Sequence, residues 1–243
     1  MKKMLIVETK LHLREWPFLL FTIGLPVGLL VVLGLSIPAM TVREGTGERA
    51  VDTQMPSLMT LLALLTLACS VVPAVLAAYR EQGVLRRMST TPVHPSRLLA
   101  VQLLINLAVG ALSTTVLIVV GSLVFGAAAP RNWAGFILVF LLGTAALLAM
   151  GLVIAALAPS AKAAPGIGSV VMFPLMFLGG MWLPRELMPD ALGVVSDFSV
   201  AGPFAQALKD TWAGQPPELM HLAVVAGGLM LFGGLAVRFF RWE

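Results

Sequence analysis

Six long apolar segments constrain this chain more than any other feature of its sequence. None of them contains a lysine, arginine, aspartate or glutamate. A helix needs about 20 mostly apolar residues to cross a hydrocarbon core of about 30 Å. The sequence therefore predicts an all-α integral membrane protein with six transmembrane helices, over residues 17–37, 57–79, 98–125, 133–158, 163–183 and 219–237.

The composition agrees with a membrane location. Of the 243 residues, 58% are hydrophobic and only 12% are charged, which excludes intrinsic disorder and argues against an ordinary soluble enzyme. The net charge of +4 is spread over too few cations to follow a phosphate backbone, so we expect no nucleic-acid partner. With Cys69 as the single cysteine, no disulfide within the chain can form.

The charges in the loops predict an orientation. The side that holds both termini carries 11 lysines and arginines and 4 acids, whereas the other side carries 5 and 8. Cytoplasmic loops are enriched in lysine and arginine. Both termini are therefore predicted to be cytoplasmic, in agreement with an even number of spans.

Two further segments do not span the membrane. Residues 1–16 carry apolar side chains near helical spacing, which predicts an amphipathic helix on the cytoplasmic interface; a frayed tail is the alternative. Residues 184–217 are unusually apolar for a loop and are interrupted by Gly193, Gly202 and Pro203. We expect short re-entrant helices there, at the outer face of a single domain that covers residues 1–243.

Several kinds of chemistry are missing from the sequence. None of the five lysines follows a glycine, so there is no phosphate-binding loop for ATP hydrolysis. The three histidines are far apart, and we predict neither a metal site nor a catalytic residue. No carboxylate lies in the middle of a span, as an ion-coupled carrier would require. The energy for any transport must then come from a partner.

The segment between the second and third apolar segments is the most informative. Arginines flank a small apolar group in it, formed by Val84, Leu85 and Met88. Such a group can dock in a groove of a cytoplasmic partner. The alternative is a basic loop that sets the topology and binds anionic lipid. The residues alone leave both interpretations open.

The order of residues in this loop resembles a known signature. From Arg80 to Val93 the pattern Arg-Glu-x-Gly-x-Leu-Arg-Arg-x-x-x-Thr-Pro-Val precedes an apolar segment. It is similar to the signature of bacterial type 2 ABC transporter permeases (ABC-2 type), in particular the daunorubicin-resistance-like drug exporter branch. The stretch from Phe177 to Pro189, Phe-Leu-Gly-Gly-Met-Trp-Leu-Pro-Arg-Glu-x-Met-Pro, is similar to the end of that family's fifth span.

The resemblance implies a partner ATPase. In that family the loop at residues 80–97 is the coupling helix that touches the ATPase, and the N-terminal helix is a second contact. Two permeases, here expected as a homodimer, work with two ATPase subunits that use ATP and Mg²⁺, and the permease itself binds no cofactor. The coupling residues implied or flanking the motif are Arg80, Glu81, Gly83, Leu85, Arg86, Arg87, Met88, Thr91 and Pro92.

The resemblance also implies an exporter of a hydrophobic or amphiphilic substrate, such as a drug, antibiotic or lipid, in a bacterial cell membrane. The path is expected at the permease dimer interface, along the first, second and fifth spans. The candidate path residues are Thr60, Thr66, Ser70, Met172, Phe173, Met176 and Phe177. Interhelical hydrogen bonds for the hydroxyl groups and lipid contact for the others remain the alternatives.

A second hypothesis comes from a different class of protein. The apolar loop at residues 184–217 carries four acids, Glu186, Asp190, Asp197 and Asp210. They would allow an interfacial active site of a membrane-embedded lipid-modifying enzyme or an assembly factor. Such a protein would be active alone, without a nucleotide.

Overall fold

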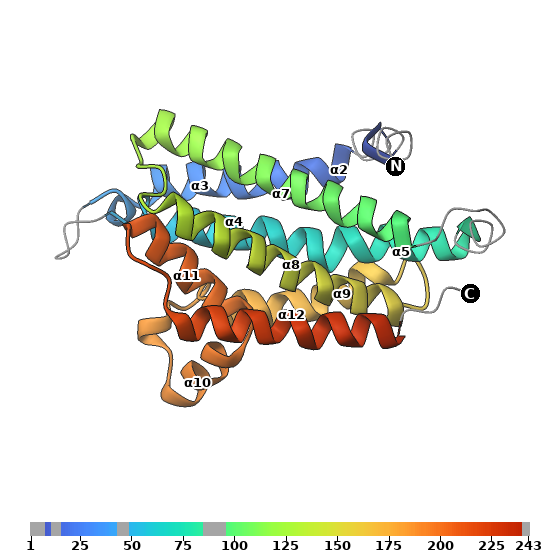
Figure 1. Cartoon of the computed structure of the whole chain (residues 1–243). Coiled ribbons are helices and arrows are strands. Elements are labelled where there is room, and N and C mark those ends of the chain that lie inside the picture. The colour runs from blue at the N-terminus through green and yellow to red at the C-terminus, as the bar shows by residue number, and fades with distance from the viewer. Residues whose placement is uncertain (1–7, 11–15, 43–48, 85–95, 240–243) are drawn as a thin grey trace.

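The computed structural model describes residues 8–10, 16–42, 49–84 and 96–239. Every regular element in these ranges is helical, and the long helices run side by side as one bundle (Figure 1). The predicted all-α membrane fold is thereby confirmed. In lipid each backbone polar group must be bonded within its own segment, so long apolar segments can only become helices.

The first two spans are each built from three consecutive helical pieces. The first comprises α2 (Trp16–Leu19), η1 (Leu20–Gly24) and α3 (Leu25–Ser36), followed by a short turn, η2 (Pro38–Met40). The second comprises α4 (Gln54–Thr66), η3 (Leu67–Val71) and α5 (Val72–Glu81).

The other elements follow in chain order. They are α7 (Ser96–Phe125), α8 (Trp133–Leu157), α9 (Ala164–Leu178), η4 (Arg185–Leu187), α10 (Asp190–Phe198), α11 (Ala201–Ala213) and α12 (Leu219–Phe239). The start of α7, the end of α12 and residues 8–10 lie at one end of the bundle, which we call the termini end (Figure 1). The helices α10 and α11 lie towards the opposite end.

Within the described ranges five helices are long and apolar enough to cross a membrane, and the expected fifth span is the exception. That span, α9, has 15 residues rather than the 21 expected, which gives it a length of about 22 Å. It ends where Gly180 adopts a φ of +86°, a conformation that stops a helix.

The segment before the last span contains the two short helices expected there. Their axes, α10 and α11, meet at an angle of 82°, which fits either a broken span or a re-entrant loop. The second of them is firmly packed, since Phe204 and Trp212 are fully buried against the bundle. The N-terminal interfacial helix expected over residues 1–16 lies mostly outside the described residues.

The second span is the centre of the bundle. In its most apolar stretch 72% of the residues are buried, against 22% in the first span and 17% in α12. The first and last spans therefore present most of their apolar surface outwards, to lipid or to another protein.

Two neighbouring helices approach the second span closely enough for their backbones to touch. The contact is at η3, a π-helical turn. A Cβ atom added at Gly151 of α8 would overlap the carbonyl oxygen of Ala68, and one at Gly168 of α9 would overlap that of Cys69. Small residues allow such close packing between membrane helices. The second span is consequently in close backbone contact with both α8 and α9 at its π-helical turn.

Candidate functional site

The last turn of α5 leads directly into the loop that carries the sequence signature, and Arg80 lies in this turn. Its guanidinium donates hydrogen bonds to the carbonyl oxygens of Ala155 and Ala156, both at 3.4 Å, and of Ala158. These carbonyls belong to the C-terminal end of α8, where helix carbonyls lack partners within the helix and carry partial negative charge. Arg80 therefore caps α8 and joins it to α5.

The neighbouring Glu81 contacts the next part of the chain. One of its carboxylate oxygens accepts a hydrogen bond of 3.0 Å from the backbone N–H of Ala161, in the turn between α8 and α9. Two adjacent residues of the signature thus attach the end of the second span to the connection between the fourth and fifth. We call this contact of Arg80 and Glu81 with residues 155–161 the α5 joint.

The chain turns away from α5 at Gly83. Its φ is +64°, a left-handed conformation that favours glycine, and its N–H donates to the carbonyl of Arg80 at 3.0 Å. This is the physical reason for a glycine at this position of the signature. The other predicted coupling residues, Leu85, Arg86, Arg87, Met88, Thr91 and Pro92, lie outside the described residues.

A buried polar cluster lies beside the α5 joint, and the sequence analysis missed it. The carboxylate oxygen Oε2 of Glu8 accepts hydrogen bonds from the Tyr79 hydroxyl and from Nε2 of Gln102, each at 2.6 Å. Nε2 of Gln102 also lies 3.3 Å from the Tyr79 hydroxyl oxygen. One signal was present in the sequence, since Gln102 and Asn106 stand one helical turn apart in the stretch 98–112, which is otherwise apolar.

The candidate path residues fall on two spans that are in contact. Thr60 and Met176 are buried, while Phe173 is 56% exposed. The Thr66 hydroxyl donates to the carbonyl of Leu62 at 2.8 Å, so its hydrogen bond is made within its own helix. Ser70, Met172 and Phe177 are half-buried.

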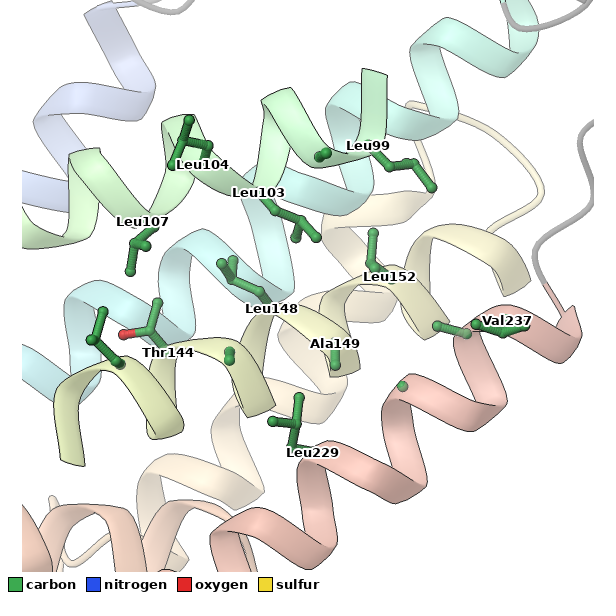
Figure 2. A pocket seen from close by; sticks show the side chains of 15 residues that line it. Leu99, Leu103, Leu104, Leu107, Thr144, Leu148, Ala149, Leu152, Leu229 and Val237 are labelled. Atoms are coloured by element: carbon green, nitrogen blue, oxygen red, sulfur yellow. The ribbon is translucent and has the colours of Figure 1, made fainter. Parts of the chain in front are cut away.

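An apolar groove lies elsewhere in the bundle. It has a volume of 660 Å³ and is lined by apolar side chains of α7, α8 and α12. Leu103 and Leu107 of α7 lie opposite Thr144 and Leu148 of α8 (Figure 2). A second cavity of 420 Å³ continues between α7 and α8 towards Trp133. No candidate path residue lines either cavity.

The acids of the loop at 184–217 are mostly engaged in ion pairs. The Asp197 carboxylate pairs with Arg185 through two bonds of 2.8 and 2.6 Å, and Glu186 pairs with Lys209 at 3.0 Å. The pKa of Glu186 is lowered, first by its own backbone N–H and then by Lys209, against an opposing effect of burial. Among the described residues no group of three or more histidines, cysteines or acids is arranged to hold a metal ion.

Comparison with known proteins agrees with the signature. Residues 2–210 match the family described as ABC-2 type transporter. The chain is 24% identical over 237 residues to the protein named Putative transport permease YvfS of Bacillus subtilis (strain 168), a match that covers 96% of this chain and 93% of the relative. No solved structure matches.

Proposed function

Because this chain belongs to the ABC-2 type transporter family, we propose that it is the membrane-spanning permease subunit of an ATP-driven exporter. Such a permease is a transport subunit rather than an enzyme, and a separate ABC ATPase binds ATP and Mg²⁺. We infer two copies of the ATPase and a homodimer of the permease, in a bacterial cell membrane with both termini in the cytoplasm. The termini end of the bundle is then the cytoplasmic end.

The α5 joint is the observation that carries this proposal. A partner that pushes on the loop after α5 acts at once on α8 and on the turn before α9, because Arg80 and Glu81 bond to both. The motion reaches the membrane centre through η3, which Gly151 and Gly168 contact at backbone distance. Packed interiors transmit such displacements because they deform little.

The partner surface follows from the loop's residues. Arg86 and Arg87 pair with acidic or backbone groups of the ATPase, and Leu85 and Met88 fill an apolar groove in it. The substrate is a hydrophobic or amphiphilic molecule, a drug, an antibiotic or a lipid. It leaves the cytoplasm or the inner leaflet along the first, second and fifth spans, beside Thr60, Ser70 and Met172.

The test is purification of the tagged chain from its native membrane in a mild detergent, followed by mass spectrometry of the proteins that accompany it. We expect a stoichiometric soluble ATPase with a phosphate-binding loop. The variant Arg86→Glu/Arg87→Glu should insert into the membrane but lose that ATPase, whereas Arg131→Glu at the opposite end should keep it. Recovery of the chain alone, or with lipid-modifying proteins, would contradict the proposal.

A further inference from the structure

Glu8 contacts both chain segments that border the signature loop. Tyr79 is the last residue before Arg80, and Gln102 lies in the second turn of α7, shortly after the loop ends. The two residues that bond Glu8 are thus 71 and 94 positions away from it along the chain. One carboxylate holds the N-terminal segment, the exit of the second span and the start of the third.

The Glu8 carboxylate is buried, so its stability depends on the hydrogen bonds that it accepts. Glu8 is 8% exposed and Gln102 is 2% exposed. A charge removed from water is tolerated only when it is well hydrogen-bonded, and bonds to a carboxylate are short and strong. The two distances of 2.6 Å agree with such bonds.

The cluster also has unused acceptors. Oε1 of Gln102 and Oδ1 of Asn106 are buried and accept no hydrogen bond from any described residue. They lie one turn apart on α7, where Asn106 donates through Nδ2 to the carbonyl of Gln102 at 2.8 Å.

Two contacts that point in different directions meet at the end of the second span. Tyr79 bonds to the N-terminal segment, while the next residue, Arg80, bonds to the end of α8. Successive residues of a helix point about 100° apart. The end of α5 is consequently held from two sides by neighbouring residues.

We propose that Glu8 is a positioning residue that latches residues 8–10 to the end of α5 and the start of α7, the two borders of the signature loop, so that these three parts move as one body. This inference rests on the proposed function for its consequence, the transfer of motion from the ATPase. It does not rest on it for the latch itself, which is a contact within the chain.

The latch is tested first without any partner. Spin labels are placed at the exposed positions 10 and 162 through Lys10→Cys and Lys162→Cys, and Cys69 is buried and does not interfere. We expect one narrow distance distribution in lipid vesicles. Glu8→Gln and Tyr79→Phe should broaden it, and the swap Glu8→Gln/Gln102→Glu should restore it. Glu186→Gln, the same change in an ion pair at the opposite end, is the matched control.

The second measurement is ATP hydrolysis by the complex reconstituted in the same vesicles. Stimulation of the ATPase by the permease should fall at least about ten-fold in Glu8→Gln, the loss expected for a bond to a charged group, with the stoichiometry of the complex unchanged. The swap should recover it.

The outcomes separate the two proposals. An unchanged distance distribution in Glu8→Gln overturns the latch. A broadened distribution with unchanged stimulation overturns the positioning role and leaves the proposed function intact. If no ATPase accompanies the chain, the proposed function fails, and the label measurement still decides whether the latch exists.

Discussion

Two arginines cap the C-terminal ends of spanning helices at opposite ends of this bundle, and they do so in different ways. Arg49 donates to the carbonyls of Phe125 and Gly126 at 3.2 and 3.5 Å, at the end of α7. It also makes two bonds of 2.8 Å to Asp52, three residues further on. Arg80 bonds the end of α8, but its acidic neighbour Glu81 bonds a different segment.

This difference indicates two roles. Around Arg49 the charge is balanced within the short segment between the first and second spans, so the cap anchors a loop to a single helix end. Around Arg80 the cation and the neighbouring anion reach two successive parts of the α8–α9 connection. The first arrangement holds a loop in place, whereas the second joins three spans beside the signature loop and suits the transfer of motion.

The largest contrast is expected from removing each guanidinium. Arg80→Met should reduce permease-stimulated ATP hydrolysis more than about ten-fold, because bonds worth about 1.5–3 kcal/mol each to a charged donor are lost at the joint. Arg49→Met should lower the unfolding temperature and leave stimulation unchanged. Both quantities are measured on the same vesicle preparations. Equal losses of stimulation in the two variants would remove the distinction between anchor and joint.

Two glycines sharpen the comparison because their surroundings match. Gly83 after α5 and Gly126 after α7 have φ values of +64° and +61°, and a Cβ at either would meet nothing within 4 Å. Alanine should therefore cost about 1–2 kcal/mol of backbone strain at each position. We expect similar losses of thermal stability, measured by unfolding in detergent. Only Gly83→Ala should also reduce stimulation of the ATPase, and an equal reduction by Gly126→Ala would argue against a special role for the signature loop.

A smaller loss of stability and of ATPase stimulation is expected from substituting the acidic neighbours of the two arginines. Glu81→Ala removes one bond to the Ala161 N–H, and Asp52→Asn removes the charge that balances Arg49. Each change should cost at most about 1 kcal/mol of stability. Stimulation of the ATPase should fall in Glu81→Ala and stay constant in Asp52→Asn. Normal stimulation in Glu81→Ala would mean that Arg80 alone makes the joint.

The sequence was sufficient to predict the helical spans, because the medium around them is a lipid bilayer rather than water. In a bilayer a long uncharged segment has no alternative to a helix, so hydropathy alone locates it. The shortness of α9 was not predicted, because the stop at Gly180 depends on a backbone conformation that an apolar segment does not reveal. The π-helical turns in the first two spans each directly precede a helix with a proline at its second position, Pro26 in α3 and Pro73 in α5.

The candidate site was predicted only in part, for a similar reason. The signature marks Arg80 and Glu81, and the structure adds what they bond. Glu8 carries no local signal of its role, since its partners Tyr79 and Gln102 come close only when three segments pack together. Pairings between residues so distant in the chain follow from the fold rather than from spacing.

The smallest expected effect is the response of the two caps to acid. Partial burial raises the pKa of Asp52, but the hydrogen bonds and charge of Arg49 together lower it below its ordinary value. A carboxyl whose folded pKa is depressed contributes stability that is complete above the unfolded pKa and is lost as the pH falls through the folded pKa. The pair therefore stabilises the loop between the first and second spans at neutral pH, by less than about 1 kcal/mol for a partly exposed pair.

A fall in pH should consequently weaken the Arg49 cap, which has a carboxylate partner, and leave the Arg80 cap, which bonds backbone carbonyls, unchanged. Between about pH 5 and about pH 3, on either side of the ordinary aspartate pKa of about 3.9, the difference in unfolding temperature between the parent and Asp52→Asn should shrink. The difference between the parent and Arg80→Met should stay constant, because backbone carbonyls do not titrate in this range. Unfolding in detergent at each pH measures both. A constant difference for Asp52→Asn would show that the carboxylate contributes nothing to the cap at Arg49, and that Arg49, like Arg80, is held by helix carbonyls alone.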